Sequence, residues 1–464
     1  MLNKTIKLIL ILLFIFTPIA FGSMEIWAFS LMELGILLLV VLWSIQNLMR
    51  NAECGMRNFR YEIIFISFFL ALILFQMIPL PTGIVRILSL KTYELRHSLA
   101  IIIPQSAIRT PQFQISFVPF LTKIEFYKWL ALSAFFLFFL HWKISRKEDS
   151  TIFHLIFVVF LTGVFESLYG MFEFFSGHDH ILYLKGISSV TGTFINRNYF
   201  AGYLLMVIPL SMGFFFYREA QARRFQGWQQ RLSAVDGKTL LIGFGIIVMI
   251  LGLLFSASRM GIVSLLLSFS LISTLLNAPQ RGRRFSRTSL LILGLALVWG
   301  IWIGLDAVIN QFFNVSEDLK SRTTIWTDSF KIVKDFPILG SGLGTFSQIF
   351  PMYKSFHIRR FVSHAENDFL QLASEVGLIG VGVLFILFIF LFVRAVAGIR
   401  SMSFADSRRY IGIGGLVSVL ALMFHSIVER NLQIPANAFL FTFLWALVLK
   451  TATVDPSAKI VRGE

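Results

Sequence analysis

The chain has 464 residues, of which 56% are apolar and only 14% are charged, and its mean hydropathy is +0.77. Soluble globular proteins carry about 25% charged residues, so the composition excludes a water-soluble enzyme, a disordered chain and a coiled coil. The net charge is +16, from 41 Lys and Arg against 25 Asp and Glu, but the basic residues lie in short runs between apolar stretches. That distribution favours a membrane-topology signal over a nucleic-acid-binding face.

Apolar runs long enough to cross a bilayer of about 30 Å recur along the whole chain. They lie at about 6–22, 26–48, 61–80, 125–142, 151–175, 199–217, 239–256, 260–276, 290–305, 377–397, 410–428 and 435–450. The sequence therefore predicts an all-α polytopic membrane protein, a single transmembrane domain over residues 1–464 with about twelve helices. The first run could also be a signal peptide, but the second span follows so closely that an uncleaved helix is favoured.

The basic loops indicate which side of the membrane each segment faces. The loops near 49–60, 143–150, 218–238, 277–289 and 394–409, together with both termini, carry nearly all of the excess positive charge. Because cytoplasmic loops are enriched in Lys and Arg, we expect these loops and both termini to be cytoplasmic.

Two long loops then face outward, at 81–124 and 306–376. The first contains Pro81, Pro104, Pro111 and Pro119, which argue against regular structure through it. The second has the composition of a soluble domain and is expected to carry short helices. Its residues 318–335 show apolar positions at three- and four-residue spacings, which predicts an amphipathic helix, ended by Pro337 and the glycine-rich turn at 340–344.

Two arginines, Arg259 and Arg322, are candidates because charged residues are informative where a membrane protein is expected to have apolar ones. Arg259 lies between two apolar runs with almost no loop; an intramembrane Arg needs a partner or a water-filled cavity, although an Arg that reaches the lipid headgroups is an equal alternative. Arg322 precedes Trp326 by four residues and so shares a helix face with it. Taken locally, Arg322 is better explained as an exposed helical arginine.

His364 lies in the sequence Ser363-His364-Ala365-Glu366, which fits a capping box with Ser363 as the N-cap residue. The pattern places His364 in the first turn of a helix, where the positive end of the helix dipole favours a neutral ring that can accept a proton. Asn367 follows closely and could orient the ring or a sugar hydroxyl. An exposed histidine near a helix cap is the alternative.

The remaining candidates carry weaker signals. His178 and His180 are too few for a metal site, the single Cys54 forms no internal disulfide, and we predict no metal. His425 and Glu429 form an i, i+4 pair that suggests a buried hydrogen bond within one helix. A polar cluster at 196–198 directly precedes the sixth span.

The order of these motifs along the chain resembles the O-antigen ligase and polymerase family of bacterial membrane glycosyltransferases. The motifs are Thr191-Gly192-Thr193-Phe194-Ile195-Asn196-Arg197-Asn198, Ser258-Arg259, Arg322 with Trp326, Pro337 to Phe346, His364 to Leu370, and Glu375-Val376-Gly377-Leu378-Ile379-Gly380. The resemblance is specific over about residues 190–450, whereas the first 190 residues match only in their pattern of spans.

The resemblance implies a glycan donor on undecaprenyl diphosphate, transferred at the periplasmic side of the inner membrane to an acceptor hydroxyl of a glycan, of lipid A-core or of another molecule. It implies neither a nucleotide sugar nor any cofactor. The family's functional residues correspond to Arg259, Arg322 and His364, the expected catalytic residues; we expect both arginines, with Arg197 and Asn367, to bind substrate. Many members have a second histidine where this chain has Glu366.

A transporter, such as a flippase of lipid-linked sugars, is the alternative, because many spans and intramembrane arginines also fit that class. Transporters usually carry an internal repeat, which is not evident here, and the long polar outer loop favours an enzyme. A non-catalytic assembly protein is a weaker third possibility. The sequence leaves open whether a ligase or a polymerase is present.

Overall fold

The computed structural model describes residues 2–49, 60–102, 112–142, 149–178, 180–182, 184–185, 189–222, 237–276, 290–295, 298, 315–356, 361–403 and 406–452. Nearly all regular structure in this part of the chain is helical. The strands that it contains are two-residue pairs, β1 (Leu80–Pro81) with β2 (Gln112–Phe113) and β3 (His180–Ile181) with β4 (Leu184–Lys185). The predicted all-α class is confirmed.

Ten of the described helices are long and apolar enough to cross a membrane. They are α1 (Leu2–Ile19), α2 (Ile26–Met49), α3 (Arg60–Met77), α6 (Pro119–His141), α7 (Asp149–Ser176), α8 (Arg197–Ala222), α10 (Gly237–Phe255), α11 (Arg259–Leu276), α16 (Asp368–Ser401) and α18 (Pro435–Ala452). An eleventh predicted span, 410–428, corresponds to α17 (Arg408–His425), which packs between α8 and α18. The predicted span at 290–305 lies mostly outside the described residues.

The centre of the bundle is formed by α8, α17 and α18, and most of the membrane-spanning part of α8 is buried. Gly213 and Gly414 let α8 and α17 approach closely, because a Cβ on Gly213 would lie 2.5 Å from the carbonyl oxygen of Tyr410. Ser418 then donates a hydrogen bond to the carbonyl oxygen of Met206 across the same contact, at 2.6 Å. Small residues and hydroxyl groups at a helix contact are typical of membrane bundles.

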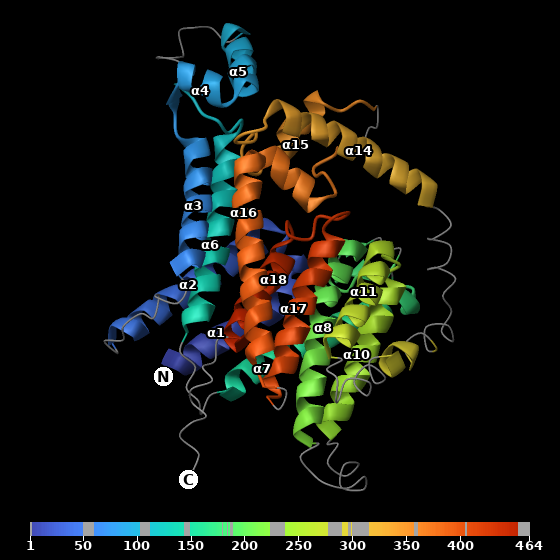
Figure 1. Cartoon of the computed structure of the whole chain (residues 1–464). Helices are drawn as coiled ribbons and strands as arrows, with labels where there is room; N and C mark the ends of the chain where they lie inside the picture. The colour runs from blue at the N-terminus through green and yellow to red at the C-terminus, as the bar shows by residue number, and fades with distance from the viewer. Residues whose placement is uncertain are drawn as a thin grey trace.

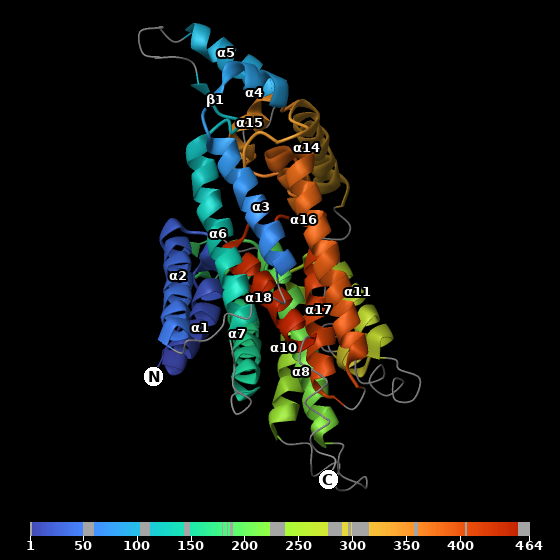
Figure 2. The same ribbon diagram turned by 60° about the vertical axis from the view of Figure 1, so that its left-hand side comes forward.

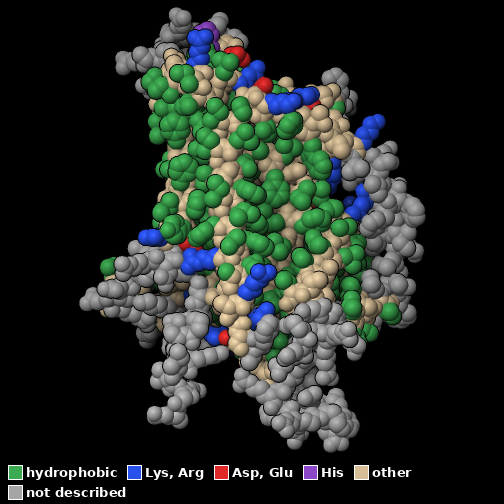
Figure 3. Space-filling view, viewed as in Figure 1, with side chains coloured by type: hydrophobic (Ala, Val, Ile, Leu, Met, Phe, Trp, Pro, Cys, Tyr) green, Lys and Arg blue, Asp and Glu red, His purple; other side chains and the backbone are tan. Residues whose placement is uncertain are grey.

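The outer surface of the bundle is apolar where lipid would contact it. Leu37 of α2, Phe68 of α3 and Phe385 of α16 are each more than half exposed. In Figure 3, hydrophobic side chains cover the middle of the visible face, and Lys and Arg side chains gather toward its two ends. Such a belt is what the hydrocarbon core of a bilayer requires, and the chain is a multi-pass membrane protein.

Both predicted outer loops fold at the same end of the bundle. Figures 1 and 2 place α4 (Thr82–Leu88), α5 (Leu90–Ile102), α14 (Val315–Asp335) and α15 (Phe346–Ile349) together, opposite to the end where α1 begins. A 3-10 turn, η5 (Phe350–Met352), follows α15. The two loops are joined directly, since the N–H of Phe117 donates to the carbonyl oxygen of Ser341 at 2.8 Å.

The expectation that 81–124 lacks regular structure is wrong, because α4 and α5 occupy its first half. Two of the four prolines lie at the ends of elements: Pro81 immediately precedes α4, and Pro119 is the first residue of α6. Pro104 and Pro111 lie outside the described residues. Proline is tolerated at the first position of a helix, where its missing N–H would be unpaired anyway. By contrast, the amphipathic helix predicted at 318–335 is confirmed as α14.

The long helix α16 is kinked at Gly377, whose φ is +65°. The kink frees two carbonyl groups, which accept hydrogen bonds from the N–H groups of Ser341 and Gly342. The buried side chain of Gln76 in α3 completes the joint by donating to the carbonyl oxygens of Leu339 and Glu375. The glycine-rich turn at 340–344 is therefore fixed to α16 at its kink.

Candidate functional site

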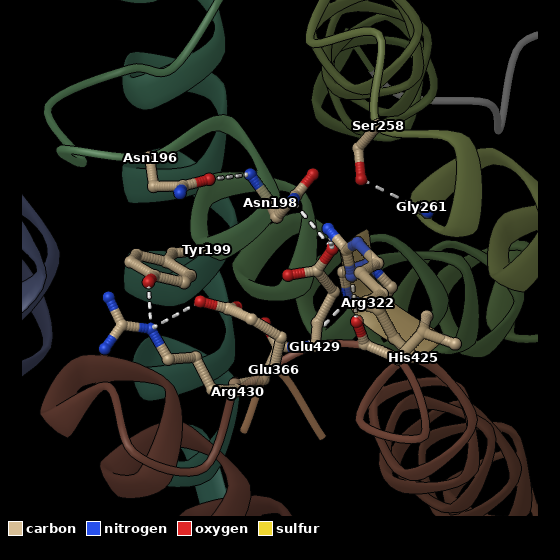
Figure 4. A network of polar contacts seen from close by, with 12 residues as sticks. Asn196, Asn198, Tyr199, Ser258, Gly261, Arg322, Glu366, His425, Glu429 and Arg430 are labelled. Carbon is tan, nitrogen blue, oxygen red and sulfur yellow. Dashed lines mark hydrogen bonds and ion pairs between the residues drawn. The ribbon is translucent and has the colours of Figure 1, made fainter. Parts of the chain in front are cut away.

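A network of polar side chains lies at the end of the bundle that carries the two predicted outer loops, where α14 meets α8 and the turn between α17 and α18. Its central member is Arg322 of α14, which is 19% exposed. Figure 4 shows this side chain directed at Glu429 and close to His425. The network joins a residue of the large outer loop to helices of the membrane bundle that lie more than 100 residues away in sequence.

Arg322 is held by two acceptors at once. One guanidinium nitrogen donates to the carboxylate of Glu429 at 2.7 Å, and the other donates to the carbonyl oxygen of Val428. Asn198, in the first turn of α8, donates to the same carboxylate oxygen of Glu429 at 2.7 Å. The planar fork of arginine suits such paired acceptors, so the orientation of the guanidinium is fixed.

Glu429 lies in the turn between α17 and α18 and is almost completely buried. Burial raises the pKa of Glu429 to about 7, although the positive charge of Arg322 acts in the opposite direction. Proton exchange on this carboxyl group near neutral pH would therefore change the charge beside Arg322.

The turn that carries Glu429 is itself held rigidly by buried amides. Asn437 donates to the carbonyl oxygen of Tyr199 and to the amide oxygen of Asn431. The amide nitrogen of Asn431 then faces the Nδ1 atom of His425 at 2.9 Å. Asp368, the first residue of α16, accepts from the N–H of Leu432 at 2.9 Å, so α16 is tied to the same turn.

A second cluster lies beside the first. Arg430 stacks over the ring of Tyr199, with its guanidinium carbon 5.1 Å from the ring centre, and donates to the hydroxyl oxygen of that tyrosine. The carboxylate of Glu366 lies 3.9 Å from the same arginine, as Figure 4 shows. Glu366 therefore belongs to an ion pair.

Arg259 and Arg197 occupy equivalent positions on neighbouring helices. Arg259 is the first residue of α11 and follows Ser258, whose hydroxyl accepts from the N–H of Gly261 at 3.3 Å. Arg197 is the first residue of α8 and follows Asn196, whose side chain accepts from the N–H of Asn198. Each arginine thus stands at the positive end of a capped helix, where a like charge is unfavourable and an anion is favoured.

The starts of α8 and α11 lie side by side. A Cβ on Gly261 would lie 3.0 Å from the Cβ of Ala201, and α8 and α11 are in contact. Asn198, one turn before Ala201, bonds the same Glu429 oxygen as Arg322. The structure therefore brings the start of α11, with Arg259, to the end of the bundle that holds Arg322.

His364 lies two residues before Glu366, which pairs with Arg430, but it does not lie in the predicted capping box. The N-cap residue of α16 is Asn367, whose side-chain oxygen accepts from the N–H of Leu370 at 2.9 Å. Glu366 has a φ of +52° and so cannot occupy the N3 position of a helix. His364 therefore belongs to the extended segment before α16, and the expectation that it stands in the first helical turn is wrong.

In place of the helix dipole, a glutamine contacts the ring. The Nδ1 atom of His364 lies 3.3 Å from the side-chain oxygen of Gln371, whose amide nitrogen donates to Glu375 at 3.2 Å. The expected substrate-binding residue Asn367 caps α16, and its contact with substrate stays a prediction, as does that of Arg197.

Two features of the site differ from the sequence interpretation. The predicted hydrogen bond between His425 and Glu429 is wrong, because α17 ends at His425 and Glu429 no longer lies one helical turn beyond it. Arg322 is not an exposed helical arginine, since it pairs with Glu429. Asn198 and Glu375 were noted in motifs of the sequence but not predicted as site residues, and Gln371 was not noted at all. The partners of Asn198 and the backbone partners of Glu375 are distant in sequence, so no sequence pattern indicated these contacts.

Residues 244–385 match a family model described as O-antigen ligase. The match contains Arg259, Arg322 and His364 and confirms the resemblance over this part of the chain, which therefore carries a domain of the O-antigen ligase type. No curated protein matches the chain.

Proposed function

We propose, from the O-antigen ligase domain at residues 244–385, that the chain is a glycosyltransferase that moves a glycan from undecaprenyl diphosphate to an acceptor hydroxyl at the periplasmic face of the bacterial inner membrane. The observation that carries the proposal is the meeting of Arg322 with the arginine-bearing starts of α8 and α11 at one end of the bundle. Cationic side chains and positive helix ends together favour an anion of high charge density, such as a diphosphate.

In the proposed reaction, the acceptor oxygen attacks the anomeric carbon of the donor sugar. The bond from that carbon to the phosphate oxygen breaks, and the lipid diphosphate leaves with the electron pair of that bond. Arg259 and Arg322 stabilise the negative charge that develops on the leaving group, which removes the need for a metal. The acceptor proton passes to His364 as general base.

The test is transfer by the purified protein in lipid, with an undecaprenyl-diphosphate-linked glycan as donor and with glycan or lipid A-core acceptors offered separately. We expect lengthened or newly linked glycan and free undecaprenyl diphosphate, with no loss of transfer in a metal chelator. Movement of the intact donor across a vesicle membrane without formation of a glycosidic bond would instead identify a transporter. The acceptor that is used would distinguish a ligase from a polymerase.

The role of His364 has its own test. A general base is typically worth about 10²–10⁴ in rate, so His364→Ala should lose transfer by that factor while inserting and folding normally. A neutral base loses activity below its pKa, ordinarily about 6.5, so transfer should fall as the pH is lowered. If His364 acted only as a cation toward the diphosphate, transfer should instead fall as the pH is raised above that pKa.

Glu429 is the control for the pH profile, because its pKa of about 7 falls in the same range. The activity that remains in Glu429→Gln should still fall at low pH if His364 is the titrating base. If the activity of Glu429→Gln no longer fell at low pH, or if His364→Ala kept full activity, the assignment of His364 as the base would be contradicted.

A further inference from the structure

The side chain of Gln371, which is 3% exposed, has an orientation that its neighbours determine. Its amide oxygen lies 3.3 Å from the backbone nitrogen of Ala365, which can only donate a hydrogen bond. Its amide nitrogen lies 3.2 Å from a carboxylate oxygen of Glu375, which is an acceptor. The reversed amide would place its NH₂ group against the N–H of Ala365, so this alternative is excluded.

This orientation decides which nitrogen of His364 carries the proton. The amide oxygen of Gln371 is an acceptor, and it lies 3.3 Å from the Nδ1 atom of His364. Nδ1 must therefore carry a hydrogen, because the other tautomer would put two lone pairs face to face. In a neutral ring with hydrogen on Nδ1, the lone pair that can accept a proton is on Nε2.

The glutamine is itself held by the joint between α16 and the glycine-rich turn. Glu375 accepts from the N–H of Gly344 at 2.9 Å and from the N–H of Phe346 at 3.2 Å. Two backbone donors thus fix the carboxylate that orients Gln371. The contacts run from the turn through Glu375 and Gln371 to His364. Because each group is held by the one before it, the ring of His364 keeps its tautomer without any rearrangement of these residues.

We propose that Gln371 is a positioning residue, which holds His364 in the tautomer with hydrogen on Nδ1 and thereby leaves Nε2 as the atom that takes the acceptor proton. The inference deepens the proposed function and rests on it, because the tautomer matters for transfer only if His364 is the base. Gln371 contacts neither acceptor nor donor in this role; it acts through the histidine.

The test uses the full-length protein in lipid, labelled with ¹⁵N in its histidine rings, at a pH about two units above the ordinary histidine pKa of about 6.5. The His364 signals are identified by their loss in His364→Ala. In the wild type, we expect the ¹⁵N shifts of a ring protonated on Nδ1. In Gln371→Met, which has similar length but no acceptor, we expect both tautomers.

Transfer rates of the same variants give the second measurement. We expect Gln371→Met to lower kcat by about 10–100-fold, the usual effect of losing a partner that orients a functional histidine, with little change in KM. The matched control is Gln348→Met, because Gln348 is exposed on the nearby helix α15; it should change neither measurement.

Hydrogen on Nε2 in the wild-type ring would overturn the inference, whatever the transfer rates are. An unchanged tautomer in Gln371→Met would also overturn it, and so would a changed tautomer with an unchanged kcat. Failure of the proposed function has a different signature: His364→Ala would then keep full transfer, while the tautomer of the wild-type ring could still be the one described.

Discussion

At the scale of single residues, the candidate site contains three arginines, two of which stand at the positive ends of helix dipoles. Arg197 and Arg259 each begin a capped helix, and Arg322 reaches the same end of the bundle from the outer loop. Like charges at a helix N-terminus cost about 0.3–1 kcal/mol each. The diphosphate of the proposed donor would offset that cost at the starts of α8 and α11.

Arg322→Lys should lose most transfer activity, because a lysine offers a single point charge where the guanidinium bonds Val428 and Glu429 together. Arg259→Lys should behave in the same way, since a lysine cannot bind a phosphate through two parallel hydrogen bonds. The measurement is glycan transfer at equal protein levels. The control is Arg408→Lys, which alters an ion pair with Asp406 before α17 and should retain activity. Wild-type transfer by both site variants would refute a diphosphate contact.

The sequence singled out candidate residues, whose roles stay predictions, but it did not predict their contacts. Arg259, Arg322 and His364 were identified by motif order, because charged residues are conspicuous in an apolar chain. The partner of Arg322 could not be predicted, since Glu429 is 107 residues away and the helix that was expected to hold it ends earlier. Gln371 escaped notice because a glutamine four residues before a glutamate is common in any helix.

At the scale of elements, the kink in α16 is the feature on which the site depends. Gly377 leaves the helical conformation, and the carbonyl oxygens of Pro337 and Ile338 accept from the N–H groups of Leu378 and Ile379 that the kink frees. The backbone of the outer loop is thereby hydrogen-bonded to the backbone of α16. In an uninterrupted helix these N–H groups would instead be used by carbonyl groups of the helix itself. Glu375, which orients Gln371, lies two residues before the kink.

Gly377→Ala should therefore destabilise the protein and lower its activity. A φ of +65° costs a residue with a side chain about 1–3 kcal/mol, and a Cβ there would lie only 2.4 Å from the carbonyl oxygen of Ile338. Thermal unfolding in detergent and transfer rate measure the two effects. Gly382→Ala on the same helix is the matched control, because nothing lies within 4 Å of the added Cβ; it should be neutral or slightly stabilising. Equal unfolding temperatures for the two variants would contradict the role given to the kink.

Element boundaries show where sequence patterns were ambiguous. Both Ser363 and Asn367 are good N-cap residues, and Ser363 also has Glu366 three positions later, as a capping box requires. The helix nevertheless begins after Asn367, because Glu366 adopts a φ of +52°. That conformation is held by tertiary contacts, including the ion pair with Arg430. Apolar periodicity alone located the long helices, because their length and hydropathy leave few alternatives.

At the scale of the whole molecule, the two outer loops and the cytoplasmic loops are predicted to face opposite sides of the membrane. The structure is consistent in its geometry: α5 and α14 lie at one end of the bundle, and the end of α8 and the start of α10 lie at the other. The asymmetry of Lys and Arg predicts which end is cytoplasmic. On that prediction we expect the proposed reaction on the periplasmic side, where the lipid-linked donor would be available.

The orientation can be measured with single cysteines in a Cys54→Ser background, labelled by a membrane-impermeant thiol reagent in cells whose outer membrane has been permeabilised. Ser98 of α5 and Thr327 of α14 are exposed at the outer end, and Ser403, which follows α16, is exposed at the opposite end. We expect Ser98→Cys and Thr327→Cys to be labelled in intact cells, and Ser403→Cys only after the inner membrane is disrupted, because the basic end of the bundle is retained in the cytoplasm.

The reverse pattern would move His364 and Arg322 into the cytoplasm, and a reaction on a periplasmic lipid-linked donor could not then be maintained. Labelling of all three sites in intact cells would indicate that the inner membrane is damaged. The control is an endogenous cytoplasmic protein with a reactive thiol, which stays unlabelled as long as the inner membrane is intact.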